Sequence, residues 1–201
     1  MNKRITDINH IFSTPVWTVI VPNFTAINTK ISSYINNLRS KEPKGKIKSN
    51  LAGWHSKNFN LQDAEPLFFI NSISAILNES LVDMGWDLKN NKLKITGMWS
   101  IINPTNASNA RHIHSNNFIS AAYYVKAPIN CGDIVFHDPR SANVIRSPIV
   151  SNINKLNSTI FSVEPKEGLL VLFPSYLHHS VNSNKSDEER IVLSFNINLI
   201  Y

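Results

Sequence analysis

From Lys92 onward the chain is a series of short runs rich in β-branched and aromatic residues, separated by Pro, Gly, Asn and Ser. The runs are KLKITGMWSIIN, FISAAYYVKA, DIVFH, TIFSVEP, GLLVLF and RIVLSFNINLI. No helical stretch lies between them, which argues against strands and helices alternating around a parallel sheet. Short strands with irregular connections are typical of a jelly roll or a related barrel. We therefore expect a mainly β fold.

Two amphipathic helices are predicted before this region. Apolar residues recur at helical spacing over Phe24–Ser40 and again from about Ala64 to Met84, with Gly85 as a C-terminal stop. At 201 residues the chain is long enough for one domain with a full core. We expect a single domain over residues 1–201, in which residues 1–91 form a helical and loop region that supports a β core of residues 92–201.

The composition is that of an ordinary soluble protein, with 17% charged and 42% hydrophobic residues. No apolar run approaches the roughly 20 residues that span a bilayer, so no membrane partner is expected. The start, MNKRITDINHIF, lacks the apolar region of a secretory signal. Cys131 is the single cysteine, so no internal disulfide can form. A reducing compartment, the cytoplasm, is the expected location.

The formal net charge of +6 makes nucleic acid a partner to consider. The densest basic stretch, Lys41–Lys48, contains Pro43 and Gly45 and no aromatic residue, so we interpret it first as a solvated loop. Trp54 and His55 follow in SNLAGWHSKNF. They could form a lid or pack in the core, and packing is favoured because neither has a partner nearby in sequence.

Two histidine pairs make a metal site the most specific prediction. His112 and His114 alternate in RHIH, and a strand would place both side chains on one face. His178 and His179 follow the run GLLVLF, and adjacent strand residues face opposite ways, so one of these two is expected to ligate. Imidazole suits iron, zinc, copper and nickel. Asp138, beside Pro139 and Arg140, is either a further ligand or a turn former.

Taken in order, these segments resemble a group of 2-oxoglutarate/Fe(II)-dependent oxygenases that share a double-stranded β-helix. That group has an H-x-H, an S-G-x-Y-Y-like strand, a G-x-(I/L)-x-F-x-D-P-R segment, F-P-S-(W/Y)-L-x-H-x-V and R-I-x-x-S-F-N. This chain supplies HIH at 112–114, SAAYYV at 120–125, CGDIVFHDPR at 131–140, FPSYLHHSV at 173–181 and RIVLSFN at 190–196. The match spans about half of the chain, and TPVW at 14–17 and SNLAGWHS at 49–56 also fit.

The resemblance implies a cupin-like double-stranded β-helix and assigns roles to the site residues. It places His179 on the family's ligand histidine, with His112 and His114 completing the metal set. An arginine can hold a carboxylate through two hydrogen bonds, and the resemblance assigns Arg190 to the distal carboxylate of 2-oxoglutarate. Tyr124 and Ser194 are its expected hydrogen-bonding neighbours in the cofactor site. Tyr123 is expected to pack on the opposite face of the strand from Tyr124.

The chain departs from the wider superfamily in two ways. His114 stands where most members have a carboxylate, so either a three-histidine centre forms, or Asp138 or a water completes the shell. Ala121 replaces an expected glycine, and Val192 replaces a common serine whose hydrogen bond Ser194 can take over.

The resemblance implies a non-haem Fe(II)- and 2-oxoglutarate-dependent dioxygenase that hydroxylates a substrate with O2 and releases succinate and CO2. One alternative is a cupin-like three-histidine dioxygenase independent of 2-oxoglutarate, which His114 favours and Arg190 opposes. The other is a non-catalytic β-barrel binding module. Small-molecule and macromolecular substrates both stay open, because specificity is expected to lie in the N-terminal half and in loops such as Ser141–Ser158. Exposed sheet edges also make a homodimer a partner to test.

Overall fold

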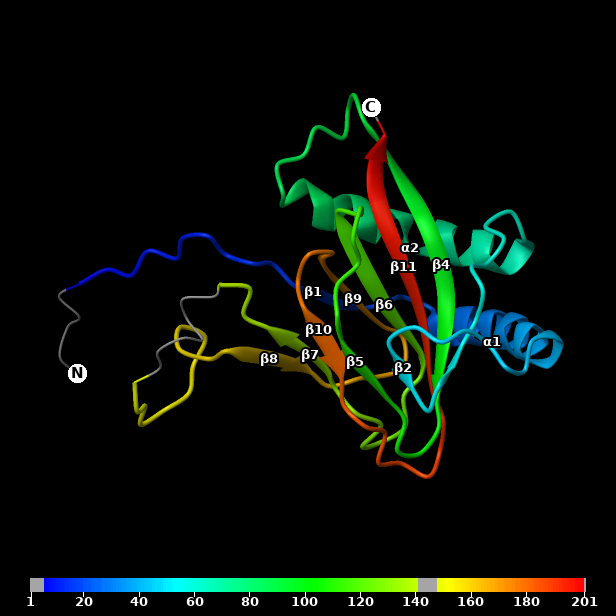
Figure 1. Cartoon of the computed structure of the whole chain (residues 1–201). Helices are drawn as coiled ribbons and strands as arrows, with labels where there is room; N and C mark the ends of the chain where they lie inside the picture. Colours follow the sequence, from blue (N-terminus) through cyan, green and yellow to red (C-terminus); the bar gives the residue numbers. More distant parts are fainter. Residues whose placement is uncertain (1–5, 141–147, 201) are drawn as a thin grey trace.

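The computed structural model describes residues 6–140 and 148–200, which form two antiparallel sheets flanked by two helices (Figure 1). The six-stranded sheet has the order β1 (Trp17–Ile20), β9 (Leu169–Pro174), β6 (Ile119–Lys126), β11 (Arg190–Ile200), β4 (Lys92–Asn103) and β3 (Trp54–His55). The five-stranded sheet has the order β2 (Asn50–Leu51), β5 (Ser108–His112), β10 (His179–Val181), β7 (Ile134–His137) and β8 (Ile160–Val163). The mainly β jelly-roll prediction is confirmed.

Both helices lie on the same side of the six-stranded sheet (Figure 1). Helix α1 (Phe24–Lys41) and helix α2 (Ala64–Val82) start where the apolar spacing predicts and end within two residues of the predicted positions. Gly85 follows α2 with a φ of 66°, a left-handed conformation that glycine adopts without steric cost. The helices bury an apolar stripe against the sheet, and its members include Ile27, Ile31, Ile35, Phe69, Ile73, Leu77 and Leu81.

Alternation along β11 separates the core from an internal cavity. Ile191, Leu193, Phe195 and Ile197 pack in the core with the helices, as the sequence predicts. The alternate residues Arg190, Val192 and Ser194 line a cavity between the two sheets. On the neighbouring strand β6, Tyr123 joins the helix-side core and donates a hydrogen bond from its hydroxyl to Asn28 Oδ1 at 2.7 Å. Tyr124 lines the cavity on the other face, so the predicted division of the two tyrosines is confirmed.

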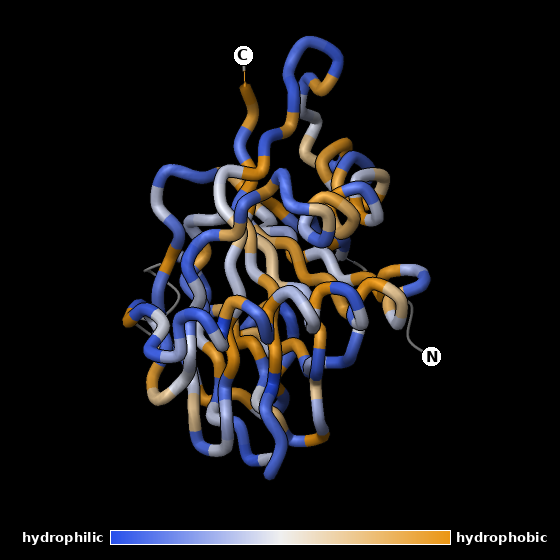
Figure 2. The backbone as a smooth tube through the Cα atoms, turned by 90° about the vertical axis from the view of Figure 1, so that its right-hand side faces the viewer, coloured by the Kyte–Doolittle hydropathy of each residue, from blue (hydrophilic) through white to orange (hydrophobic). Residues whose placement is uncertain are grey.

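A second apolar cluster fills one end of the space between the sheets. It includes Ile134, Phe136, Val171, Phe173 and Leu177. The Phe136 and Phe173 rings meet edge to face with their centroids 4.9 Å apart. Hydrophobic positions run along the central strands while the loops at the lower end of the molecule are mostly hydrophilic (Figure 2). The packed cluster closes one side of the cavity and keeps it apolar there.

Two further expectations concern membrane-spanning helices and the loop Ser141–Ser158. Within residues 6–140 and 148–200, neither helix is long and apolar enough to cross a membrane. Part of the predicted specificity loop Ser141–Ser158, namely residues 141–147, lies outside the described residues.

Candidate metal centre

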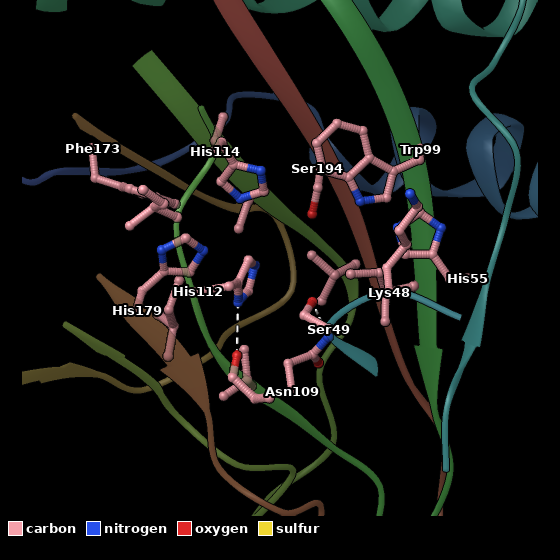
Figure 3. Close-up of a pocket in the computed structure, with 18 of the residues that line it drawn as sticks. Lys48, Ser49, His55, Trp99, Asn109, His112, His114, Phe173, His179 and Ser194 are labelled. Carbon is pink, nitrogen blue, oxygen red and sulfur yellow. Dashed lines mark hydrogen bonds between the residues drawn. The ribbon is translucent and has the colours of Figure 1, made fainter. Parts of the chain in front are cut away.

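Three of the predicted histidines converge on one point of the cavity (Figure 3). His112 ends β5, His114 follows two residues later, and His179 begins β10, where it pairs directly with His112. One ring nitrogen from each histidine lies within 4.8 Å of the other two. The centroid of the His179 ring is 4.3 Å from that of His112 and 5.1 Å from that of His114. The five-stranded sheet thus assembles three nitrogen donors from two distant parts of the sequence.

Backbone carbonyl groups orient two of the rings. His112 Nδ1 lies 2.7 Å from the Ala110 carbonyl oxygen, and His179 Nδ1 lies 2.9 Å from the Leu177 carbonyl oxygen. A carbonyl oxygen only accepts hydrogen bonds, so each Nδ1 carries the proton and donates it. The Nε2 atoms are left with their lone pairs available. Ligand histidines in metalloproteins are commonly held in this way.

The protonation state of the cluster also suits metal binding. Burial lowers the pKa of His179 to about 3 and that of His114 to about 4, and repulsion between the neighbouring imidazoles adds to both shifts. Burial lowers the pKa of His112 as well. All three rings are therefore neutral near pH 7, which is the form that binds a metal.

The donor set fits Fe(II). Three neutral imidazoles on one side leave the remaining coordination positions toward the cavity, and imidazole is a common iron ligand. The structure does not bring Asp138 into this cluster. Its Oδ1 accepts hydrogen bonds from the backbone N–H and from Nε of Arg140 at 2.9 and 3.0 Å, and its Oδ2 accepts one from Nη2 at 2.8 Å. Asp138 forms a turn with Arg140, the other role that the sequence allowed.

Arg190 lies in the same cavity, at the start of β11. The residue is 1% exposed, and its Nη1 donates hydrogen bonds to the carbonyl oxygens of Cys131 at 2.6 Å and Gly132 at 2.8 Å. Its buried Nε has no hydrogen-bond partner within the described part of the chain. A buried guanidinium with an unsatisfied donor is costly unless an anion completes it. An anion in the cavity could complete the hydrogen bonding of Arg190.

Tyr124 and Ser194 line the same cavity as this guanidinium. Tyr124 is buried, which raises the pKa of its hydroxyl group, while the charge of Arg190 acts in the opposite direction. Ser194 turns its hydroxyl oxygen toward the cavity (Figure 3). Tyr124 pairs across the sheet with Val192, two residues from Arg190, whereas Ser194 lies four residues along β11, roughly 13 Å away at the rise of a strand. Tyr124 is therefore the nearer hydrogen-bond donor to an anion at Arg190.

The cavity has a volume of about 580 Å³, within the usual range for small-molecule sites. His179, Phe173 and the other two histidines lie on one side, and Trp99, His55 and Lys48 lie across from them (Figure 3). In the second group, His55 belongs to SNLAGWHS, which fits the family resemblance, and was considered as a lid or as packing, whereas Trp99 and Lys48 were not predicted to line a site.

The two residues considered as a lid or as packing have different roles. Trp54 is buried in the core and donates a hydrogen bond from its Nε1 to the Glu42 carbonyl oxygen at 2.9 Å. His55 is 8% exposed and lines the cavity, where its ring stacks on Trp99 with centroids 5.9 Å apart. The centroid of the Trp99 ring is also 5.6 Å from that of the His114 ring. An aromatic row therefore runs from the cavity wall to the histidine cluster.

Comparison with known proteins places this geometry in context. Residues 97–196 match the family model described as "Putative 2OG-Fe(II) oxygenase". The viral collagen prolyl hydroxylase of Paramecium Bursaria Chlorella virus-1, solved with 2OG, is similar in structure at 15% identity, with a TM-score of 0.56 over 90% of this chain and 94% of that chain. A prolyl-4-hydroxylase from Pseudomonas putida has 14% identity and a TM-score of 0.59, with coverage of 92% and 93%.

A third similar structure is the epimerase SnoN in complex with Fe3+, alpha ketoglutarate and nogalamycin RO. It has 13% identity and a TM-score of 0.67 over 92% of this chain and 78% of that chain. At such identities the structural likeness establishes the fold. No curated protein sequence matches this chain significantly.

Proposed function

The chain belongs to the family of 2-oxoglutarate- and Fe(II)-dependent oxygenases, and we propose that His112, His114 and His179 hold its iron while Arg190 holds its 2-oxoglutarate. The reaction converts a substrate C–H group, O2 and 2-oxoglutarate into C–OH, CO2 and succinate. One oxygen atom enters the substrate and the other enters succinate, so the equation balances. The enzyme is an oxidoreductase, and the family match leaves its substrate open.

The observation that most supports this proposal is the state of Arg190. Its guanidinium is buried in the cavity of the histidine cluster, two backbone carbonyl groups fix its Nη1, and its Nε has no partner among the described residues. A dicarboxylic acid can satisfy a metal centre and a fixed guanidinium at once, because it has an acid group at each end. The distal carboxylate of 2-oxoglutarate is the group we assign to Arg190.

The protein contributes orientation and exclusion of water. The carbonyl groups of Ala110 and Leu177 hold two of the ligand rings with Nε2 available. Phe173 and Val192 form apolar walls of the cavity, and a dry site strengthens the electrostatic contacts inside it. We assign to Tyr124, which lines the cavity with Arg190, a hydrogen bond from its hydroxyl group to the same carboxylate. Iron, when bound, supplies the activation of O2 that the protein side chains cannot perform.

The three-histidine set also fits a dioxygenase that does not use 2-oxoglutarate, and His114 in place of a carboxylate is the observation that favours it. That enzyme would have no use for a buried, unsatisfied guanidinium in the cavity. The two functions differ in their products, because only the first releases succinate as the substrate is oxidised.

The direct test is a titration of 2-oxoglutarate into anaerobic, Fe(II)-loaded protein, followed through the visible charge-transfer band of the chelate. We expect a saturable band in the wild-type protein and none in His179→Ala. His178→Ala is the matched control, because that residue is adjacent, exposed and outside the cavity lining. Bound iron without a band would shift the assignment to the three-histidine dioxygenase. Absence of iron binding would contradict both enzymes.

A further inference from the structure

The charged side chains of the cavity are all cationic. Among the described residues that line it, Lys48, Arg111 and Arg190 are basic, and none is Asp or Glu. Arg190 is assigned to 2-oxoglutarate. Arg111 is exposed and directly precedes His112 on β5, so its side chain lies on the opposite face of the strand from the His112 ring. The third basic residue, Lys48, lies on the wall of the cavity opposite the histidine cluster.

The segment around Lys48 is built into the fold. The Asn50 side chain accepts a hydrogen bond from the Lys48 backbone N–H at 2.8 Å and donates to the carbonyl oxygens of Lys46 at 3.1 Å and Gly53 at 2.7 Å. The Ser49 carbonyl oxygen accepts a hydrogen bond from the Ala110 N–H at 2.8 Å. Ala110 lies two residues before His112 on β5, so the wall and the metal ligand are anchored to the same strand.

The positive charge of this wall is not neutralised within the protein. Glu42 is the acidic residue of the Lys41–Lys48 stretch, and its carboxylate pairs with Lys57. In residues 6–140 and 148–200 no carboxylate forms an ion pair with Lys46 or Lys48. Repulsion from both lysines lowers the pKa of His55, after the larger effect of burial. The field of the two lysines therefore reaches the cavity wall.

Neutral groups on the same wall add hydrogen-bonding capacity. The indole N–H of Trp99 has no acceptor in the described part of the chain, and Trp99 lies between His114 and His55. His55 Nδ1 lies 2.7 Å from the Ser56 carbonyl oxygen and donates to it, which leaves Nε2 as an acceptor. Figure 3 shows Trp99, His55 and Lys48 together, across the cavity from His179. The wall offers a cation and a donor to a ligand in the cavity.

We propose that the substrate carries an oxyanion, a carboxylate or a phosphate, which binds Lys48 and the Trp99 indole N–H. This inference rests on the function proposed above and specifies its substrate class. An oxyanion on this wall would place the rest of the substrate between Trp99 and the histidine cluster, where the reacting C–H group must lie. A cationic substrate would meet Lys48 without any carboxylate in the lining to offset the repulsion.

The test measures binding of three probes to the anaerobic Fe(II)- and 2-oxoglutarate-loaded enzyme by isothermal titration calorimetry. The probes are phenyl phosphate, phenylacetate and the cation benzylamine. We expect one or both oxyanions to bind and benzylamine not to bind, and the two oxyanions distinguish a phosphate from a carboxylate. Lys48→Glu should weaken oxyanion binding about tenfold or more, since attraction at contact distance becomes repulsion. Equal binding of benzylamine would overturn the proposal.

Lys44→Glu is the matched control, because it makes the same charge change in the same basic stretch and Lys44 does not line the cavity. It should leave oxyanion affinity within about twofold of wild type, as expected for a screened surface charge. Unchanged affinity in Lys48→Glu, or equal losses in both variants, would refute a specific role for Lys48. Displacement of 2-oxoglutarate by the probe would also refute it, since the oxyanion would then bind Arg190.

The charge-transfer band separates this inference from the proposed function. A normal band in Lys48→Glu together with weakened oxyanion binding supports both. A normal band in every variant without any oxyanion binding refutes the substrate class and leaves the oxygenase assignment intact. Absence of the band in the wild-type protein refutes the proposed function itself, and with it the inference that rests on it.

Discussion

Replacement of Arg190 by lysine is the most informative single change in this site. The guanidinium presents five N–H donors in a planar fork, and Nη1 already serves the carbonyl oxygens of Cys131 and Gly132. Nε is buried without a partner in the described residues and the residue lines the cavity, so the guanidinium keeps donors that an anion can use. Lysine keeps the positive charge but has neither the fork nor the second donor at that position. The change therefore isolates the geometry of the anion contact from its charge.

The size of the effect follows from the contact that is lost. A hydrogen bond to a charged group is worth about 1.5–3 kcal/mol. Since about 1.4 kcal/mol corresponds to a factor of ten, the Kd for 2-oxoglutarate should rise about 10- to 150-fold. The free energy of unfolding should also fall by about 1–3 kcal/mol, because one of the two carbonyl groups that Arg190 serves is left unsatisfied.

The assay is the anaerobic 2-oxoglutarate titration, followed through the charge-transfer band, with urea denaturation of the same sample to confirm that the variant is folded. Arg39→Lys is the matched control. Arg39 makes a two-pronged ion pair with Glu189 at 2.8 and 2.9 Å on the surface, so the same chemical change there leaves the cavity intact. An unchanged Kd in folded Arg190→Lys would remove Arg190 from the cofactor site, and an equal loss in Arg39→Lys would show that the effect is not local.

Three further predictions concern the fold and the metal ligands. Gly132 has a φ of 90°, and a Cβ there would collide with the Asn182 carbonyl oxygen, so Gly132→Ala should lower the free energy of unfolding by about 2 kcal/mol or more. Gly85→Ala, with open space around the added Cβ, should lower it by about 1 kcal/mol, and urea denaturation compares the two variants. In iron-free protein the pKa values of about 4 for His114 and about 3 for His179 lie below the value of a histidine in the unfolded chain, so the unfolded state takes up protons first as the pH falls. The stabilising contribution of the two neutral rings is complete above about pH 6.5 and is lost as the pH falls toward their folded pKa values, by about 1.4 kcal/mol per pH unit for each ring. Denaturation of the iron-free protein at about pH 7 and about pH 5 would measure this loss. His114→Asp should retain Fe(II) in metal analysis because a carboxylate also ligates iron, while His114→Ala should bind it at least about tenfold more weakly; equal retention by both would remove His114 from the ligand set.

The parts of the fold that sequence reasoning predicted are those with a long periodic signal. The two helices repeat apolar residues over four or more turns, and the run at residues 92–103 is β4 from end to end. The alternation along β11 also predicted which face holds Arg190 and which joins the core. In each case the hydrophobic pattern is long enough to specify both the element and its buried face.

The strands that carry the proposed metal ligands have no hydrophobic pattern of their own. Strand β5 has the sequence SNARH, and β10 has only three residues, so neither shows apolar alternation. They form because β10 pairs with β5 on one side and β7 on the other, and such pairing depends on backbone groups far apart in the sequence. The histidines were identified through their spacing and the family resemblance.

On the opposite wall of the cavity, only the segment SNLAGWHS, which contains His55, fits the family resemblance, and no hydrophobic alternation marks Lys48 or His55 as cavity residues. Lys48 and His55 flank a turn, and two-residue strands, β2 and β3, attach that turn to different sheets. No local pattern in the sequence reports that His55 meets Trp99 across a gap of 44 residues. The turn does contain a tight contact, because a Cβ on Gly53 would lie 2.7 Å from the Asn103 side-chain oxygen. Specificity residues on such connections are visible only in the folded structure.

Charge balance links the two proposals. Three neutral imidazoles add no negative charge to a divalent metal ion, in contrast to a set that includes a carboxylate. Among its described lining residues the cavity holds Lys48, Arg111 and Arg190 and no acid, so every compensating anion must come from bound molecules. The two carboxylates of 2-oxoglutarate match the two charges of the metal and leave the cavity cationic. A substrate with an oxyanion reduces this excess of positive charge. The absence of a carboxylate among the three histidines and the presence of Lys48 on the opposite wall would therefore both favour an anionic substrate.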